Sequence, residues 1–230
     1  MKKIILFLFC FFCSMTSVHA EKYDWADNAF AFSSIRTALI YELDTSQAQL
    51  GNDILEKSLQ GDYLKKASRP HYSILSAEQV SRKISLQQGI DLYLMEKDDP
   101  EGFQAAFAAH ASKFVQIYVK TKLLEYKTGF YIVPAHTEWR TKDLTDTFTD
   151  KDGRQQTITR TISYPEYIPD NTVSTATVKL RFDVYDARTG KAVFSREELR
   201  TRDSSDDPNG VFQRMLDSFF NDLQRKMDKD

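Results

Sequence analysis

Three histidines are the first candidates for metal or acid–base chemistry in this sequence: His71, His110 and His136. A zinc hydrolase needs two imidazoles one helical turn apart together with a carboxylate, as in H-E-x-x-H. These histidines lie on unrelated predicted elements. His136-Thr137-Glu138 matches half of a zinc deaminase signature, but the cysteine pair of that signature is absent. We therefore predict structural or surface roles for all three histidines, and neither a metal nor another cofactor.

Motifs for phosphate binding and acyl transfer are also missing. Gly190 and Lys191 are followed by Ala192, where a phosphate-binding loop requires Ser or Thr. No G-x-G-x-x-G occurs, and no serine lies in a G-x-S-x-G or S-x-x-K motif. On these grounds we predict that the protein is not an enzyme.

Paired carboxylates are the remaining candidates for general acid–base catalysis. Asp183 and Asp186 form one pair, and Glu197 and Glu198 form another. Asp183 alternates with apolar neighbours on a predicted strand, so we expect its side chain to face solvent. A hydrolase that uses Asp or Glu is kept as the enzymatic alternative.

A calcium loop is suggested by Asp150, Asp152 and Gly153, which match positions 3, 5 and 6 of the twelve-residue loop. Positions 1 and 12 would be Phe148 and Thr159, and neither offers a carboxylate. We expect a hairpin turn here instead, formed by Asp150 and Gly153, because glycine readily adopts the positive φ that such a turn needs.

The first 20 residues have the organisation of a secretory signal. Two lysines precede an apolar segment, Ile4 to Cys13, and Val18-His19-Ala20 provides small or modest side chains before a cleavage site. We predict that the mature chain starts at Glu21 and is periplasmic or secreted. The apolar segment is shorter than the roughly 20 residues that cross a bilayer, so we expect no stable membrane span after cleavage.

The positions of the cysteines and the net charge argue against further classes of function. Cys10 and Cys13 both lie in the predicted signal, so the mature chain has no thiol for a disulfide or a metal. The whole chain carries 31 basic and 33 acidic side chains, and removal of the two signal lysines leaves 29 against 33, a net charge of −4. This balance does not favour nucleic-acid binding.

Helices and short strands alternate in the first half of the predicted mature chain. Leu50 to Tyr63 has apolar residues at helical spacing, and Pro70 disfavours helix at the residue before it. Ser76 and Gln79 match a capping box, which indicates the start of a second helix. We predict strands over 36–43 and 72–75, and helices over 50–68, from 77 onward and from 98 onward.

From Phe114 onward the hydrophobic period changes from 3.6 to 2, which predicts strands. Asp186 and Gly190 are expected to form the turn of a hairpin. The Pro-containing segment from Tyr164 to Pro169 is expected to be an extended connector. We predict strands over 114–123, 130–133, 141–149, 154–164, 176–184 and 191–199, followed by a helix from 208.

The order of these elements predicts an α+β sandwich, with a mixed, largely antiparallel sheet and amphipathic helices on one face. The arms flanking Asp150 are polar on both faces, so we expect a protruding polar β-hairpin. We expect residues 21–230 to form a single domain, with this hairpin as a β-ribbon insertion near 141–164.

The stretch VKLRFDVYDARTGKAVFSREE, Val178 to Glu198, resembles the terminal hairpin of exported bacterial α/β proteins, in which a Y-D-x-x-T-G-K turn precedes a final helix. Tyr23-Asp24-Trp25, followed by a strand at Arg36, is similar to the start of small uncharacterised envelope proteins of that type. In outline these resemble the periplasmic modules of penicillin-binding-protein activator lipoproteins and the TolB amino-terminal domain. The resemblance implies a module that binds other proteins.

Our first functional hypothesis is an exported, non-enzymatic interaction module of the bacterial cell envelope. We expect it to bind an envelope protein through its sheet edge and the polar β-ribbon. Aromatic side chains beside proline on an exposed segment are suited to docking. The candidate partner-binding residues are Tyr164, Glu166, Tyr167 and Ile168.

The alternative is a periplasmic carrier of a small ligand or lipid. It would need an apolar pocket between the helices and the sheet. Phe103, Phe107 and Trp139 are the residues predicted to line that pocket.

Overall fold

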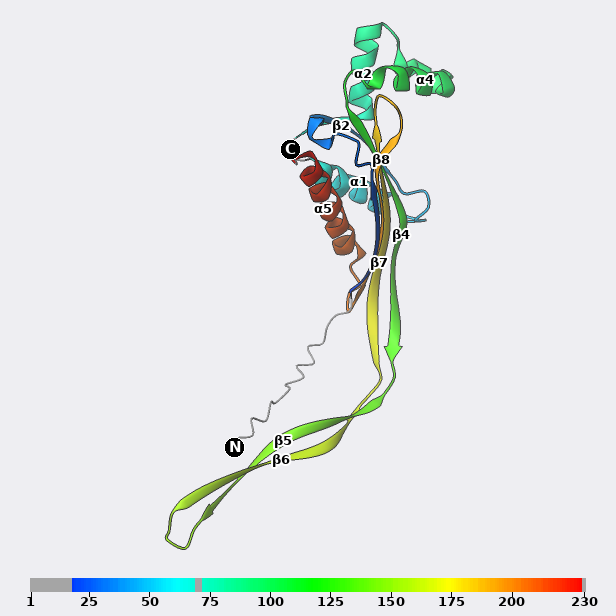
Figure 1. The fold of residues 1–230 in the computed structure, drawn as a ribbon. Coiled ribbons are helices and arrows are strands. Elements are labelled where there is room, and N and C mark those ends of the chain that lie inside the picture. The colour runs from blue at the N-terminus through cyan, green and yellow to red at the C-terminus, as the bar shows by residue number, and fades with distance from the viewer. Residues whose placement is uncertain (1–17, 69–71, 229–230) are drawn as a thin grey trace. The chain divides into compact units, whose positions relative to one another are not determined.

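The computed structural model describes residues 18–68 and 72–228 (Figure 1). Most of the predicted signal, as well as His71, lies outside these residues. In chain order the elements are β1 (Val18–Ala26), a 3-10 turn (Phe32–Ser34), β2 (Thr37–Asp44), α1 (Asp53–Ala67), β3 (Ser73–Ser76), α2 (Ala77–Gln88), α3 (Leu92–Asp98), α4 (Pro100–Ala111), β4 (Ile117–Val133), β5 (His136–Thr149), β6 (Gln155–Ile168), β7 (Asn171–Asp186), β8 (Ala192–Asp203) and α5 (Pro208–Met227).

Six strands form the main sheet, in the order β1-β8-β7-β4-β2-β3. β8 pairs antiparallel with β1 on one side and with β7 on the other. β2 pairs parallel with both β3 and β4. The mixed sheet and its five helices confirm the predicted α+β class.

The helices pack against both faces of this sheet, whereas one covered face was predicted. Strand β2 shows the physical reason, because it buries apolar residues on both sides. Ala38 and Ile40 join the core beneath α1 and α5, while Leu39 joins a second core with α2, α3 and α4. A strand that is buried on both faces needs cover on both faces.

Helix α5 lies alongside the main sheet (Figure 1) and contributes many side chains to the larger core. Asp207 caps its first turn by accepting from the amide of Gly210, and Pro208 occupies the position where a missing amide costs nothing. The ring of Phe219 stacks on that of Phe182, with 3.9 Å between centroids. Along the helix the buried side chains are Val211, Phe212, Met215, Leu216, Phe219, Phe220, Leu223 and Met227.

Residues Phe130–Ser174 form a separate compact unit built on a two-stranded hairpin of β5 and β6. The hairpin pairs antiparallel from His136 opposite Ile168 to Thr149 opposite Gln155. Nearly all of its side chains are exposed, as expected for strands that are polar on both faces.

The segment from Tyr164 to Ile168 is part of β6, so its prediction as a connector was wrong. Tyr164 pairs with Arg140, and Pro165 pairs with Trp139. Proline lacks an amide donor but is tolerated in a strand that has no neighbour on one side. In a two-stranded ribbon both strands are edges, so Pro165 does not interrupt the pairing.

Candidate functional site

The edge strand β1 presents two large aromatic side chains to solvent. Tyr23 is 69% exposed and Trp25 is 52% exposed. They lie two residues apart on one strand and therefore point to the same face of the sheet. Exposed aromatic pairs of this kind are unusual on a solvent surface and are common at binding interfaces.

The strand register extends this surface across β8 and β7. Tyr23 lies opposite Glu197, which lies opposite Arg181. In the next row, Trp25 lies opposite Ser195, which lies opposite Asp183. We call these two rows of side chains the edge platform; it comprises Tyr23, Trp25, Arg181, Asp183, Ser195 and Glu197. A hollow of about 250 Å³ lies over it, lined by all of these except Asp183, together with Asp24.

The polar centre of the edge platform is held in place by hydrogen bonds. Asp183 accepts from Nε of Arg181 at 3.0 Å and from Oγ of Ser195 at 2.7 Å. Asp183 is only 7% exposed, so the prediction that it faces solvent was wrong. Ser195 across the strands and Arg181 two residues away on β7 supply the hydrogen bonds that a buried carboxylate requires.

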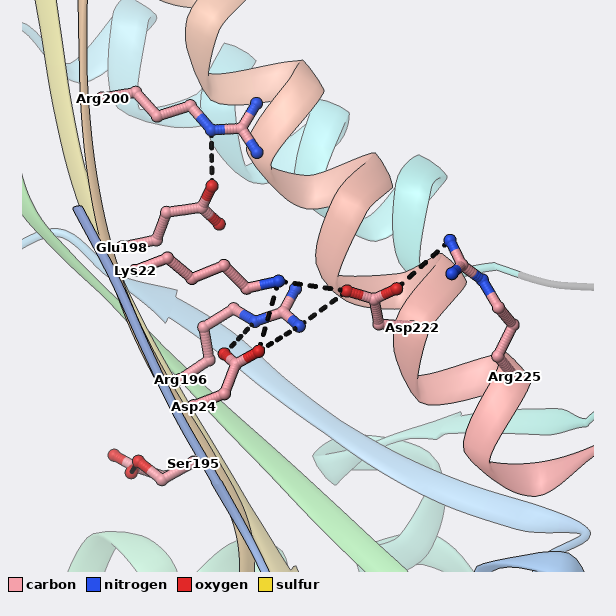
Figure 2. Close-up of polar contacts among 9 residues, drawn as sticks. Lys22, Asp24, Ser195, Arg196, Glu198, Arg200, Asp222 and Arg225 are labelled. Atoms are coloured by element: carbon pink, nitrogen blue, oxygen red, sulfur yellow. Dashed lines mark hydrogen bonds and ion pairs between the residues drawn. The ribbon is translucent and has the colours of Figure 1, made fainter. Parts of the chain in front are cut away.

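A buried arginine, Arg196, points to the opposite face of the sheet from Ser195 of the edge platform (Figure 2). Arg196 is 1% exposed and donates to both carboxylate oxygens of Asp24, at 2.6 and 3.0 Å. It also donates to Asp222 of α5 at 2.7 Å. Its guanidinium lies 5.6 Å from the ring centroid of Phe194 and 5.7 Å from that of Phe219.

This Arg196 network ties the edge strand to the helix. Asp24 stands between Tyr23 and Trp25 on β1, and its side chain points to the opposite face. Lys22 reaches Asp24 at 3.2 Å and Asp222 at 3.3 Å (Figure 2). The two hydrogen bonds between Arg196 and Asp24, together with the contacts of Lys22 with Asp24 and Asp222, therefore hold β1 in place. This is the strand that carries both exposed aromatic side chains.

Acidification is expected to weaken this network. Burial raises the pKa values of Asp24 and Asp222, but hydrogen bonds and attraction from Arg196, then from Lys22, outweigh it and hold both pKa values below the ordinary range. A carboxyl with a lower pKa in the folded chain stabilises the fold above its unfolded pKa of about 4, and this stabilisation is lost as the pH falls through the folded value.

The free energy of unfolding, measured with urea at about pH 7 and about pH 3, should therefore fall more for the wild type than for Arg196→Met. In that variant the two carboxyls keep Lys22 but lack Arg196, the larger of the two influences that lower their pKa values. An equal fall in both proteins would show that Arg196 does not set the acid sensitivity.

The predicted partner-binding residues belong to the hairpin unit, whereas the edge platform belongs to the unit that holds the main sheet. Tyr167 is 69% exposed and Tyr164 is 39% exposed. Glu166 forms an ion pair with Arg140 at 2.6 Å. Ile168 is the last residue of β6 and lies opposite His136, the first residue of β5.

The predicted turn residues lie in two tight turns. Oδ1 of Asp150 accepts from the amides of Asp152 and Arg154, and Gly153 has φ 78°. Asp186 accepts from the amide of Arg188 and from the hydroxyl of Thr189, and Gly190 has φ 68°.

The other candidates for chemistry are dispersed. His136 is exposed on the hairpin, where the backbone carbonyl of Pro134 and the carboxylate of Glu138 raise its pKa. His110 lies on α4. Within residues 18–68 and 72–228, no group of three or more His, Cys, Asp or Glu side chains is placed to hold a metal ion.

The residues predicted to line a carrier pocket have separate surroundings. Phe103 and Phe107 pack against each other in the core beneath α4, with 5.8 Å between ring centroids. Trp139 lies on β5 and is 74% exposed. Phe103 and Phe107 therefore fill the core instead of lining a pocket. Of the helices in the described part of the chain, none combines the length and apolar character that a bilayer crossing requires.

The fold defines an α+β protein with a six-stranded mixed sheet, and its site is an exposed surface at the edge of that sheet. No protein-family model matches the sequence, and no curated protein matches it.

Solved structures with a similar arrangement include the PelC dodecamer from Paraburkholderia phytofirmans, at 11% identity and a TM-score of 0.43, covering 90% of this chain and 98% of that one. Lipoprotein GNA1162 from Neisseria meningitidis is similar at 15% identity and a TM-score of 0.36, covering 83% of this chain and 99% of that one. The hypothetical protein CT253 from Chlamydia trachomatis is similar at 12% identity and a TM-score of 0.34, covering 83% and 94%.

Sequence reasoning did not find the edge platform. Its available signal was the alternation of Tyr23, Asp24 and Trp25, which is typical of a strand with one aromatic face. Arg196 gave no such signal. In the sequence alone, a charged residue that points into the core from a strand cannot be told from one that faces solvent.

Proposed function

We propose that this protein is an exported, non-enzymatic interaction module of the bacterial cell envelope that binds a partner protein at the edge platform. The observation that carries this proposal is the exposure of Tyr23 and Trp25 on an edge strand. Tyrosine, tryptophan and arginine are the residues that most often contribute binding energy at protein interfaces, and the edge platform combines all three.

The proposed partner contributes an extended segment. Among residues 18–68 and 72–228, β1 has a strand beside it on one side alone, so its outer backbone groups are available to a further strand. Side chains of such a segment would lie beside Tyr23 and Trp25, where the hollow of about 250 Å³ offers space. Arg181 and Glu197 supply one charge of each sign for polar contacts across the hollow.

The Arg196 network supports this proposal because it fixes the strand before binding. A surface that is already ordered loses less conformational entropy when a partner docks. The proposal includes export, and it includes the resemblance of Val178 to Glu198 to the terminal hairpin of exported bacterial α/β proteins, which are similar in outline to periplasmic modules of penicillin-binding-protein activator lipoproteins and the TolB amino-terminal domain.

The proposal is tested by capturing proteins from an envelope extract on the immobilised chain from Glu21 onward. Tyr23→Ala combined with Trp25→Ala should lower recovery of a specific partner by at least about tenfold, since truncation of an aromatic hot spot costs about 2 kcal/mol or more. Tyr93→Ala is the matched control, because Tyr93 is 80% exposed on α3, and it should recover the same amount as the wild type.

Unchanged recovery by the double variant would refute the edge platform as the binding surface. A second arm deletes residues 144–162 from the hairpin. If this deletion recovers the same proteins as the wild type, the β-ribbon and its Tyr164 to Ile168 segment do not contribute to binding.

A further inference from the structure

Three arginines converge near the amino-terminal end of α5. Arg200 and Arg202 lie two residues apart on β8 and point to the face that α5 covers. Together with Arg214 and Val211 of α5 they line a small cavity of about 40 Å³. Nε of Arg214 donates to the carbonyl oxygen of Gly210, which holds its side chain against the helix.

Positively charged groups outnumber carboxylates in this arginine cluster. Arg200 donates to Glu198, a carboxylate that is 1% exposed (Figure 2). Arg200 is therefore paired with a buried carboxylate, while Arg202 and Arg214 bring two further guanidinium groups to the same cavity. Guanidinium groups bind carboxylates in a bidentate manner, so the cluster is suited to an additional carboxylate from outside.

Beside this arginine cluster, the outer edge of β8 is paired with the first residues of β1. These residues belong to the predicted signal. Val18 pairs with Arg202, His19 with Thr201, and Ala20 with Arg200. The predicted cleavage after Ala20 removes all three partners. The mature chain would then begin at Glu21, opposite Leu199, and the outer backbone of β8 beyond that point would have no strand beside it.

We propose that the mature protein binds an extended acidic segment of a partner protein at this vacated edge of β8. Unpaired backbone groups of an edge strand form hydrogen bonds with an added strand. Carboxylates at every second position of the added strand would all face Arg200, Arg202 and Arg214. This inference rests on the proposed function and gives the chemistry of the partner.

A synthetic peptide of alternating glutamate and valine, labelled with a fluorophore, tests the inference by fluorescence anisotropy. The chain from Glu21 onward should bind it at least about tenfold more tightly than a chain that keeps Val18, His19 and Ala20. The same peptide with glutamine for glutamate should bind at least about tenfold more weakly to the chain from Glu21 onward. Equal binding by the two chains, or equal binding of the two peptides, would overturn the inference.

Charge reversals then locate the contact. Arg202→Glu and Arg214→Glu should each weaken peptide binding at least about tenfold. Arg188→Glu makes the same change of charge in the exposed β7–β8 turn and should leave affinity within about twofold. Arg200 is left intact, because its loss would strand the buried Glu198. If the control weakens binding as much as the other two variants, the attraction is general and the inference fails.

The test separates this inference from the proposed function. Tyr23 and Trp25 point to the opposite face of the sheet, so their double variant should still bind the acidic peptide. Normal partner capture with no peptide binding would refute the arginine cluster alone. Peptide binding with unchanged partner capture by the double variant would refute the edge platform alone.

Discussion

Replacing Phe219 with alanine is expected to lower the free energy of unfolding by about 3–5 kcal/mol. The ring is fully buried and stacks on Phe182 at 3.9 Å and beside Phe194 at 5.7 Å between centroids. It also meets Phe220 edge to face at 5.1 Å. Its removal leaves a cavity between rigid aromatic neighbours, which cannot collapse to fill it.

Urea denaturation followed by far-ultraviolet circular dichroism measures this change. Phe130→Ala is the matched control, since Phe130 is 72% exposed, and it should cost less than about 0.5 kcal/mol. Comparable losses in the two variants would mean that the stack at Phe219 is not a central part of the core.

Replacing Arg196 with methionine is expected to lower the free energy of unfolding by about 2–3 kcal/mol. Methionine retains much of the length of the side chain but leaves Asp24 and Asp222 without their shared guanidinium. The cost lies toward the lower end for a buried ion pair, because the side chain of Asp24 is 39% exposed and that of Asp222 is 23% exposed. Loss of the cation–π contacts of the guanidinium with the rings of Phe194 and Phe219 adds to this cost.

The control for Arg196→Met is Arg82→Met, which breaks an exposed ion pair with Glu78 on α2 and should cost less than about 0.5 kcal/mol. Arg196→Met should also loosen β1, so amide hydrogen exchange at Tyr23 and Trp25 is expected to become faster than in Arg82→Met. If amide exchange at Tyr23 and Trp25 is unchanged in both variants, the Arg196 network does not keep the edge strand ordered.

Local signals in the sequence predicted those elements whose ends and faces are specified by neighbouring residues. The capping box is confirmed at α2, where Ser76 accepts from the amide of Gln79 and Gln79 accepts from that of Ser76. The final helix was expected from its apolar stripe, and β2 from its alternation. In each case the pattern lies within about 20 residues of chain.

The features that sequence reasoning missed depend on contacts between distant segments. Arg196 and Asp24 are 172 positions apart, and no local pattern relates them. The buried Asp183 accepts a hydrogen bond from Ser195, which strand register places opposite it. β1 went unrecognised because three of its residues were read as part of a signal, and α3 because it is only seven residues long.

The position of α5 along the chain affects how the protein folds during synthesis. In the part of the chain that the structure describes, all eight strands precede α5, so the sheet emerges from the ribosome before the helix that covers its larger core. Until α5 follows, Phe182 and Phe194 lack their cover and the chain cannot close around them. Because the core closes late, the newly made polypeptide would remain without complete tertiary structure. This state suits passage through a translocation channel on the export route proposed above.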